Sequence, residues 1–223
     1  MPSRDPWLLT PGPLTTSATV KAAMLHDWGS RDGTFIAINR HMRERLVELA
    51  GGKGTHVCVP LQGSGTFAVE AMFGTFVPPK GRVLILINGA YGKRMTRICE
   101  YYRRDYKVLE WAEDRPVDPA AVAKALAEDA AISHVAVVHC ETTSGVLNPL
   151  AEVAAVVAKA GRRLLVDAMS AFGAIALDVR EVPFDAVAAS SNKCIEGVPG
   201  VGFGPAKSIV PAAPSTWPTL RKS

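Results

Sequence analysis

Residues 132–167 read ISHVAVVHCETTSGVLNPLAEVAAVVAKAGRRLLVD, and this stretch determines the fold that we expect. Val, Leu and Ala fill an apolar run at 134–140 and a second one at 163–167, as in strands that are covered on both faces. Between these runs, residues 150–160 have apolar positions at helical spacing, and the Gly161 that follows favours the end of a helix. The stretch therefore predicts a strand, a helix and a second strand.

The same alternation continues outward in both directions along the chain. Asp118 marks the start of one further helix, because Asp is a good N-cap and the following Pro119 fits a first helical turn. Alternating strands and helices predict an α/β fold with a mostly parallel central sheet and helices on both faces. We expect further strands at 56–61, 82–88, 107–111 and 184–189, and further helices at 67–73, 92–103 and 119–128.

Composition argues against several classes of protein. The formal net charge is only +4 and the basic residues are dispersed, so no nucleic-acid partner is expected. The four cysteines form no CxxC pair and no spaced Cys/His set, so we expect neither a metal site nor a disulfide framework. The aliphatic runs are too short to span a bilayer, and the first residues lack the pattern of a signal peptide. These features indicate a cytoplasmic protein without a membrane partner.

Polar residues follow the predicted strands at the edge where open α/β sheets bind ligands. After the first strand the chain reads Gly63-Ser64-Gly65-Thr66 and then enters a helix. Glycines allow close approach of an anion, and the first N–H groups of a helix, with two hydroxyls, can donate to it. The pattern favours a phosphate site, although a tight turn capped by Thr66 explains it equally well.

Two further loops are less specific when taken alone. Tyr91 lies between Gly89 and Gly92 after the strand at 82–88, and it is either a ring-stacking residue or a rim or core residue. Residues 141–145 read Glu-Thr-Thr-Ser-Gly and form either a hydroxyl cluster that faces a ligand or a capped polar turn. The preceding His139 is interpreted as a packed core residue.

Asp167 and Lys193 give the edge its chemistry. Asp167 ends a buried strand, where a carboxylate is costly unless it has a cationic partner such as a ligand nitrogen. Lys193 follows the run at 184–189, and burial of an ammonium group is also costly, which suits a lysine that forms imines. An anion site, an aromatic ring, hydroxyls, a buried Asp and a buried Lys are the groups needed to hold pyridoxal phosphate.

The order of these motifs resembles that of the class V (fold type I) aminotransferases. The motifs are GSGT at 63–66, NGAYG at 88–92, ETTSG at 141–145, VDAMS at 166–170 and SSNKCIEGVPG at 190–200. With LLTPGPLTT at 8–16, the chain is most similar to the 2-aminoethylphosphonate–pyruvate transaminases within that class. The resemblance implies a pyridoxal-phosphate-binding large domain over 7–204, followed by an irregular Pro-rich tail over 205–223. The family continues into a smaller C-terminal domain, which we expect to be missing from this chain.

The resemblance also implies a role for each matched residue. Lys193 would hold pyridoxal 5'-phosphate as a Schiff base, and Asp167 would pair with the ring nitrogen of the cofactor. The remaining cofactor contacts would be Ser64, Gly65 and Thr66 at the phosphate, Tyr91 against the ring, Thr142 near O3′, and Asn192. The substrate pocket would include Pro11, Gly12 and Thr15.

The implied reaction moves the amino group of 2-aminoethylphosphonate to pyruvate and gives phosphonoacetaldehyde and L-alanine. The family's sites form between two subunits, so a homodimer is expected. Two alternatives stay open: another class V reaction, such as alanine–glyoxylate or serine–glyoxylate amino transfer, and a fragment that holds the cofactor without turnover. We expect this chain to bind the cofactor without a normal turnover rate, because the family's substrate-binding arginine lies in the C-terminal domain.

Overall fold

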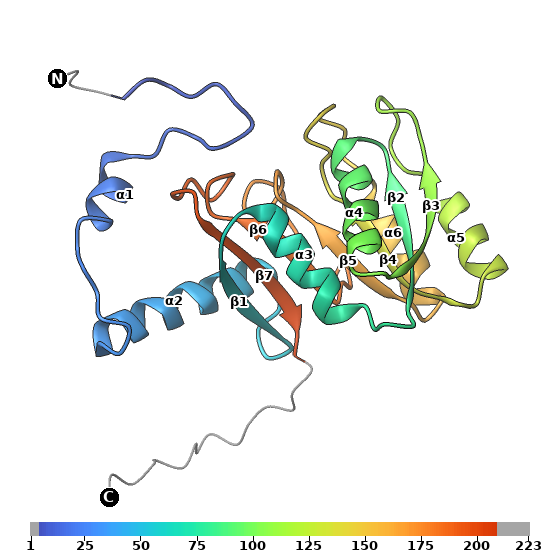
Figure 1. The fold of residues 1–223 in the computed structure, drawn as a ribbon, viewed down its shortest axis with the longest axis horizontal. Coiled ribbons are helices and arrows are strands. Elements are labelled where there is room, and N and C mark those ends of the chain that lie inside the picture. The colour runs from blue at the N-terminus through green and yellow to red at the C-terminus, as the bar shows by residue number, and fades with distance from the viewer. Residues whose placement is uncertain (1–4, 209–223) are drawn as a thin grey trace, which may run out of the picture.

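The strands form one sheet. The three strands that end at or just before Thr142, Asp167 and Lys193 lie next to one another in the middle of this sheet. The computed structural model describes residues 5–208, and within them the strand order is β1-β7-β6-β5-β4-β2-β3 (Figure 1). β3, β2, β4, β5 and β6 run parallel, whereas β7 is antiparallel to both of its neighbours, so the mostly parallel sheet is confirmed. The strands are β1 (His56–Gln62), β2 (Arg82–Ile87), β3 (Asp105–Glu110), β4 (Ile132–Val138), β5 (Arg163–Asp167), β6 (Ala186–Ser190) and β7 (Val201–Lys207).

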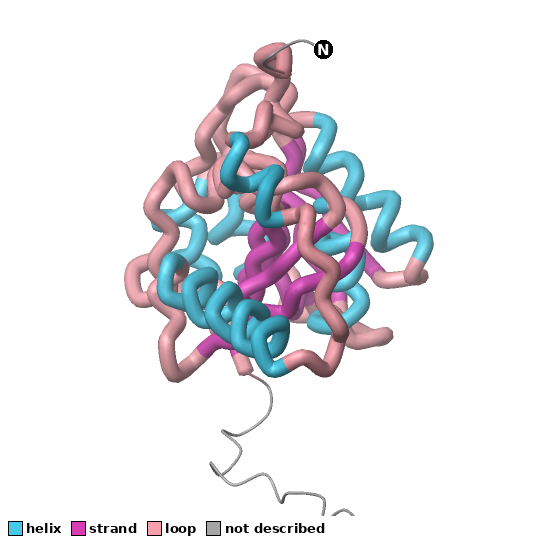
Figure 2. Tube along the Cα trace, turned by 90° about the vertical axis from the view of Figure 1, so that its left-hand side faces the viewer, coloured by secondary structure: helices cyan, strands magenta, loops and turns pink. Residues whose placement is uncertain are grey.

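Helices cover both faces of the sheet, as predicted. In Figures 1 and 2 the strands lie between two helical layers, with α3 and α4 on one face and α2, α5 and α6 on the other. A short helix, α1, belongs to the N-terminal segment that extends away from the sheet. The helices are α1 (Ala18–Ala23), α2 (Gly33–Leu49), α3 (Gly65–Phe76), α4 (Ala90–Tyr101), α5 (Pro119–Glu128) and α6 (Leu150–Lys159).

Side chains alternate along each strand and so supply both layers of the core. In β2, Leu84 and Leu86 pack with α5 and α6, whereas Val83, Ile85 and Ile87 pack with α3 and α4. All five side chains are at most 2% exposed. A strand buried on both faces needs apolar residues at every position, which explains why these strands are continuous apolar runs in the sequence.

The predicted elements are confirmed, with their ends shifted by a few residues. The helix predicted at 119–128 is α5, and its predicted cap is present, since the Asp118 carboxylate accepts the Ala120 N–H at 2.8 Å. Gly161 follows α6 with a φ of +66°, the left-handed conformation that glycine adopts after a helix end. Within residues 5–208, no helix is long and apolar enough to cross a membrane.

The predicted start of the irregular tail is wrong, because β7 continues through Pro205 to Lys207. Pro205 lies opposite Cys58 of β1, while the pairing of β7 with β6 is interrupted there, as expected for a residue without an N–H. Glycine is needed at position 204, because a Cβ atom there would lie only 2.6 Å from the Val187 carbonyl oxygen. The rest of the predicted tail, 209–223, lies outside the described residues. The division of the chain into domains stays a prediction.

Candidate functional site

The strand ends bring the predicted cofactor residues around two adjoining cavities. One cavity has a volume of about 330 Å³, and the other is a narrow hollow of about 20 Å³ that reaches Asp167. Gly65, Thr66 and Tyr91 line both cavities, which places the hollow directly beside the larger space. The larger cavity is also lined by Ser64, Thr142, Asn192 and Lys193.

The turn after β1 places the start of α3 at the cavity. Ser64 is the N-cap of α3, because its Oγ accepts the N–H of Phe67 at 3.2 Å, so the alternative in which Thr66 caps this helix is wrong. Gly65 is required for close packing, since a Cβ there would lie 2.5 Å from the Met169 sulfur. The first N–H groups of α3 have no partner within the helix, and they carry partial positive charge toward the cavity.

Asp167 is buried at the end of β5, at 4% exposed. Burial is the main cause that raises the pKa of its carboxyl group to about 6, and the nearby Glu141 carboxylate adds to the shift. One bond opposes the shift, because the Asp167 Oδ1 atom accepts the N–H of Met169 at 3.0 Å. A buried carboxyl group with a raised pKa is suited to pair with a cationic group inside the hollow.

Lys193 lies on the turn after β6 and is half-buried, so it does not end the buried strand itself. Its Nζ atom lies 3.4 Å from the Gly12 carbonyl oxygen, which places the N-terminal segment against the lysine. Leu14 donates its N–H to the Asn192 carbonyl oxygen at 3.3 Å and holds that segment in place. Lys193 lines the larger cavity, so a ligand there can reach its amine.

The predicted substrate residues are only partly brought to this site. Gly12 contacts Lys193, since a Cβ at Gly12 would lie 2.9 Å from the lysine Nζ. The hydroxyl of Thr15 instead donates to the Pro6 carbonyl oxygen at 2.9 Å and accepts the Leu8 N–H at 2.7 Å. Thr15 thus stabilises a turn of the N-terminal segment, and Pro11 is exposed beside Gly12.

Thr142, on the loop after β4, lines the larger cavity. The Thr142 hydroxyl donates to Ser170 Oγ at 3.1 Å, and Ser170 donates to the Cys140 carbonyl oxygen at 2.7 Å. His139, interpreted from the sequence as a core residue, is 5% exposed, and burial lowers its pKa. The histidine is thus part of the packed strand end and not of the cavity wall.

Two residues of the site were not identified from the sequence. Arg94 lines both cavities and donates from Nη1 to Thr66 Oγ1 at 2.8 Å. Glu141 is fully buried, and its Oε1 atom accepts the Thr143 hydroxyl at 2.9 Å and the Tyr91 N–H at 3.4 Å. A sequence signal existed for each, since Arg94 is one helical turn after Tyr91 and Glu141 directly follows a buried run.

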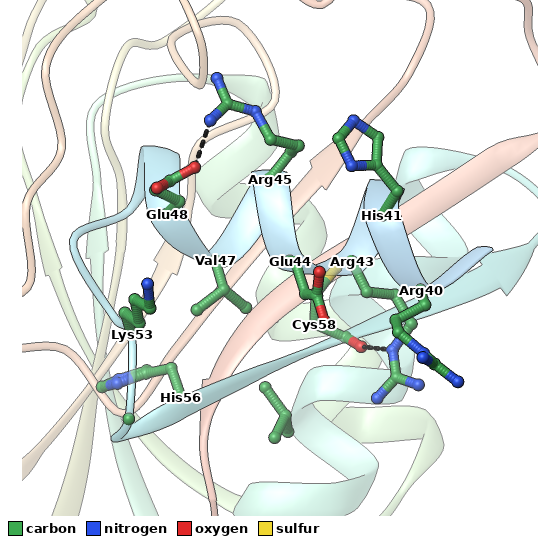
Figure 3. A pocket seen from close by; sticks show the side chains of 12 residues that line it. Arg40, His41, Arg43, Glu44, Arg45, Val47, Glu48, Lys53, His56 and Cys58 are labelled. Carbon is green, nitrogen blue, oxygen red and sulfur yellow. Dashed lines mark hydrogen bonds and ion pairs between the residues drawn. The ribbon is translucent and has the colours of Figure 1, made fainter. Parts of the chain in front are cut away.

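A larger cavity, with a volume of about 690 Å³, lies elsewhere, between α2 and the edge strand β1 (Figure 3). Its walls carry an ion pair between Arg45 and Glu48, and Arg43 donates from Nε to the Cys58 carbonyl oxygen at 2.8 Å. None of the predicted cofactor residues lines it. Volume alone therefore does not locate the site, whereas the strand-end residues do.

The chain is similar to known proteins over most of its length. The family model "Aminotransferase class-V" matches residues 17–212. The chain is 58% identical over 205 residues to a 2-aminoethylphosphonate–pyruvate transaminase of Pseudomonas aeruginosa, covering 92% of this chain and 55% of that protein. It is 61% identical over 203 residues to 2-aminoethylphosphonate–pyruvate transaminase 2 of Burkholderia lata, covering 91% of this chain and 54% of the relative. The chain thus spans about 55% of the length of these relatives.

Solved structures show the same fold. An alanine–glyoxylate aminotransferase from Nostoc sp. superposes with a TM-score of 0.86 at 26% identity, covering 93% of this chain and 55% of that one. The ureidoglycine–glyoxylate aminotransferase from Bacillus subtilis gives a TM-score of 0.85 at 26% identity, with 92% and 54% covered. The chain thus has the fold of the fold type I aminotransferase large domain, as predicted. On the family match, the fold and the strand-end residues, the chain belongs to the class V aminotransferases.

Proposed function

We propose that this chain holds pyridoxal phosphate for the transfer of an amino group from 2-aminoethylphosphonate to pyruvate. The observation that carries the proposal is the similarity to transaminases of that name, at 58% identity over 205 residues and 61% identity over 203 residues. The products would be phosphonoacetaldehyde and L-alanine. Because the chain spans about 55% of the length of these relatives, the substrates and the full reaction are part of the proposal.

The residues present fit the proposed cofactor. A phosphate would lie at the start of α3, where Ser64, Gly65 and Thr66 supply hydroxyl and N–H donors. The buried Asp167 carboxyl group would pair with the ring nitrogen, and the half-buried Lys193 amine would bind the aldehyde carbon. Tyr91, Thr142 and Asn192 complete the lining, in the roles of ring stacking, an O3′ contact and a further cofactor contact.

When bound, pyridoxal phosphate supplies an aldehyde that takes up the amino group and a ring that accepts electrons as the Cα proton leaves. Asp167 keeps a proton on the ring nitrogen, because its buried carboxylate is stabilised by that positive charge. The Lys193 amine would be the base that moves the Cα proton, because it lines the same cavity and a general base must lie within hydrogen-bond reach of that proton. Residues at the start of α3 hold the phosphate and so fix the orientation of the ring.

A homodimer and a cytoplasmic location belong to the same proposal. Large apolar side chains are exposed along the N-terminal segment, with Leu9 at 95%, Leu25 at 87% and Met24 at 63%. That segment extends away from the sheet (Figure 1), so a second copy of the chain could cover it. The free cysteines Cys58, Cys99, Cys140 and Cys194 suit a reducing compartment. Light scattering on the purified chain tests the dimer, and a monomer at all concentrations would contradict it.

A single-turnover experiment tests the reaction. The purified chain is loaded with pyridoxal phosphate, mixed with excess 2-aminoethylphosphonate, and then denatured to measure the pyridoxamine phosphate that has formed. We expect conversion with 2-aminoethylphosphonate to exceed conversion with L-serine or L-alanine at equal concentration. Faster conversion with either amino acid would assign the chain to another class V reaction, and no conversion with any donor would leave a cofactor-binding fragment.

A further inference from the structure

Arg94 of α4 contacts two residues of the proposed cofactor site. Its Nη1 atom donates to the hydroxyl oxygen of Thr66 at 2.8 Å, and its guanidinium carbon lies 4.6 Å from the centre of the Tyr91 ring. It lines the hollow beside Asp167 and also the larger cavity beside Lys193. The side chain thus bridges the N-terminal ends of α3 and α4.

Arg94 forms no ion pair with a carboxylate of the described chain. None of the ion pairs within residues 5–208 includes it, whereas its neighbour Lys93 pairs with Glu110 at 3.2 Å. A guanidinium group stays positively charged throughout the pH range in which proteins function. The Asp167 carboxylate lines the same hollow and interacts electrostatically with Arg94 without forming an ion pair, so the exposed guanidinium group can still pair with an anionic group of a ligand in the larger cavity.

Hydrogen-bond directions at the start of α3 point to the same partner. A guanidinium group can only donate, so its bond to Thr66 uses an oxygen lone pair and leaves the hydroxyl hydrogen free. The hydroxyl hydrogen of Ser64 is also free to donate, because the Ser64 Oγ atom accepts the N–H of Phe67. Both hydroxyl groups are therefore available as donors at a helix N-terminus, which is the arrangement that a phosphate group needs.

We propose that Arg94 is a positioning residue for the phosphate of the cofactor, because it fixes Thr66 as a donor and adds positive charge beside α3. The inference rests on the proposed function, since it requires that the cavity bind pyridoxal phosphate. It goes further by assigning a role to a residue outside the recognised motifs. It also requires that the contribution of Arg94 depend on the phosphate and not on the aldehyde or the ring.

Comparison of pyridoxal phosphate with pyridoxal, which lacks the phosphate, tests this requirement. Dissociation constants for both compounds are measured by absorbance titration for the wild type, Arg94→Gln, Arg94→Lys and the control Arg97→Gln. Arg97 is exposed on the same helix, as Arg94 is, but it lines neither cavity. We expect Arg94→Gln to weaken pyridoxal phosphate binding at least about tenfold and pyridoxal binding by no more than about twofold. Arg94→Lys should be intermediate, because it keeps the charge without the planar geometry.

Thr66→Val provides a second variant that keeps the side-chain volume and removes the hydroxyl. If Arg94 acts partly through Thr66, the loss caused by Arg94→Gln should be smaller in the Thr66→Val background than in the wild type. Thermal unfolding of each variant without cofactor shows whether the fold is intact.

Each outcome bears on one of the two proposals. An equal loss for both compounds would overturn the inference, because Arg94 would then act through the Tyr91 ring or the fold. An unchanged Arg94→Gln variant would also overturn it, while leaving the proposed function intact. A wild-type chain that attaches neither compound at Lys193 after borohydride reduction would overturn both.

Discussion

Glu141 occupies the space that a side chain at Gly89 would need. A Cβ atom at Gly89 would overlap the Cγ and Cδ atoms of Glu141 and lie 2.7 Å from the Thr143 hydroxyl oxygen. In return, Thr143 accepts the N–H of Ala90 and Glu141 accepts the N–H of Tyr91, each at 3.4 Å. The loop after β4 thus caps the start of α4, which Gly89 cannot cap itself because it has no side chain.

Gly89→Ala should therefore destabilise the chain by about 1–3 kcal/mol, the usual cost of forcing an extra methyl group into a packed site. The backbone itself is not the cause, since the φ of Gly89 is 168°, an extended conformation open to any residue. Gly33→Ala is the matched control, because a Cβ there meets nothing within 4 Å. Urea unfolding compares the two variants, and equal stabilities would show that Glu141 moves aside without cost.

Ser64→Ala tests the two roles assigned to one hydroxyl group. Loss of an N-cap costs about 1 kcal/mol, and the same loss is expected for Asp118→Ala at the start of α5, far from the site. Only Ser64→Ala should also weaken pyridoxal phosphate binding, because only Ser64 lines the cavity. Unfolding and cofactor titration are measured on both variants. Equal cofactor affinity in the two would restrict Ser64 to a structural role.

Local pattern predicted most of the sheet, because β2, β4 and β5 are buried on both faces and read as apolar runs. It did not predict α2 as an element, because this helix of 17 residues buries only Leu46 and Val47, too few for a clear period. It also failed at β7, where Gly202, Gly204 and Pro205 oppose the strand pattern. The partners of β7 are β1 and β6, and pairing with distant strands outweighs these local preferences.

The residues of the site also fall into two groups, those that the sequence predicts and those that it does not. Ser64, Asp167 and the Lys193 turn follow strands, so the topology of a parallel sheet is enough to bring them to one edge. Arg94 and Glu141 depend on side-chain contacts across 28 residues to Thr66 and 50 residues to Tyr91. Local pattern marks Arg94, one helical turn after Tyr91, and Glu141, directly after a buried run, but it does not encode contacts over such separations.

Lys193 should be the lysine that attaches the cofactor. Borohydride reduction in the presence of pyridoxal phosphate is expected to label Lys193 in a peptide map, since its amine lies in the cavity with the phosphate donors. Lys193→Ala should abolish the label. Lys53→Ala is the control, because Lys53 lines the separate cavity between α2 and β1 (Figure 3). A label on Lys53, Lys80 or Lys93 in the wild type would remove Lys193 from its proposed role.

Asp167→Asn should have opposite effects on the empty chain and on cofactor binding. In the folded chain the pKa of Asp167 is raised from 3.8 to about 6, mainly by burial, so folding favours the protonated form. The stability from this group is fully present below the unfolded pKa and is lost as pH rises through about 6. A shift of roughly two pKa units corresponds to about 3 kcal/mol, which is the upper bound of the expected gain for Asp167→Asn at pH above about 7.

The gain should vanish below about pH 4, where the wild-type carboxyl group is protonated in both states. Asp178→Asn serves as a control of opposite sign, because Arg180 lowers the pKa of Asp178 to about 2. Loss of the Asp178 carboxylate should therefore destabilise the chain at neutral pH. Pyridoxal phosphate binding to Asp167→Asn should weaken markedly, since a buried cation loses its charged partner, a change of about 3–5 kcal/mol. Unfolding across pH and cofactor titration separate the two effects. A variant that is less stable when empty yet binds the cofactor normally would contradict the role proposed for Asp167 on both counts.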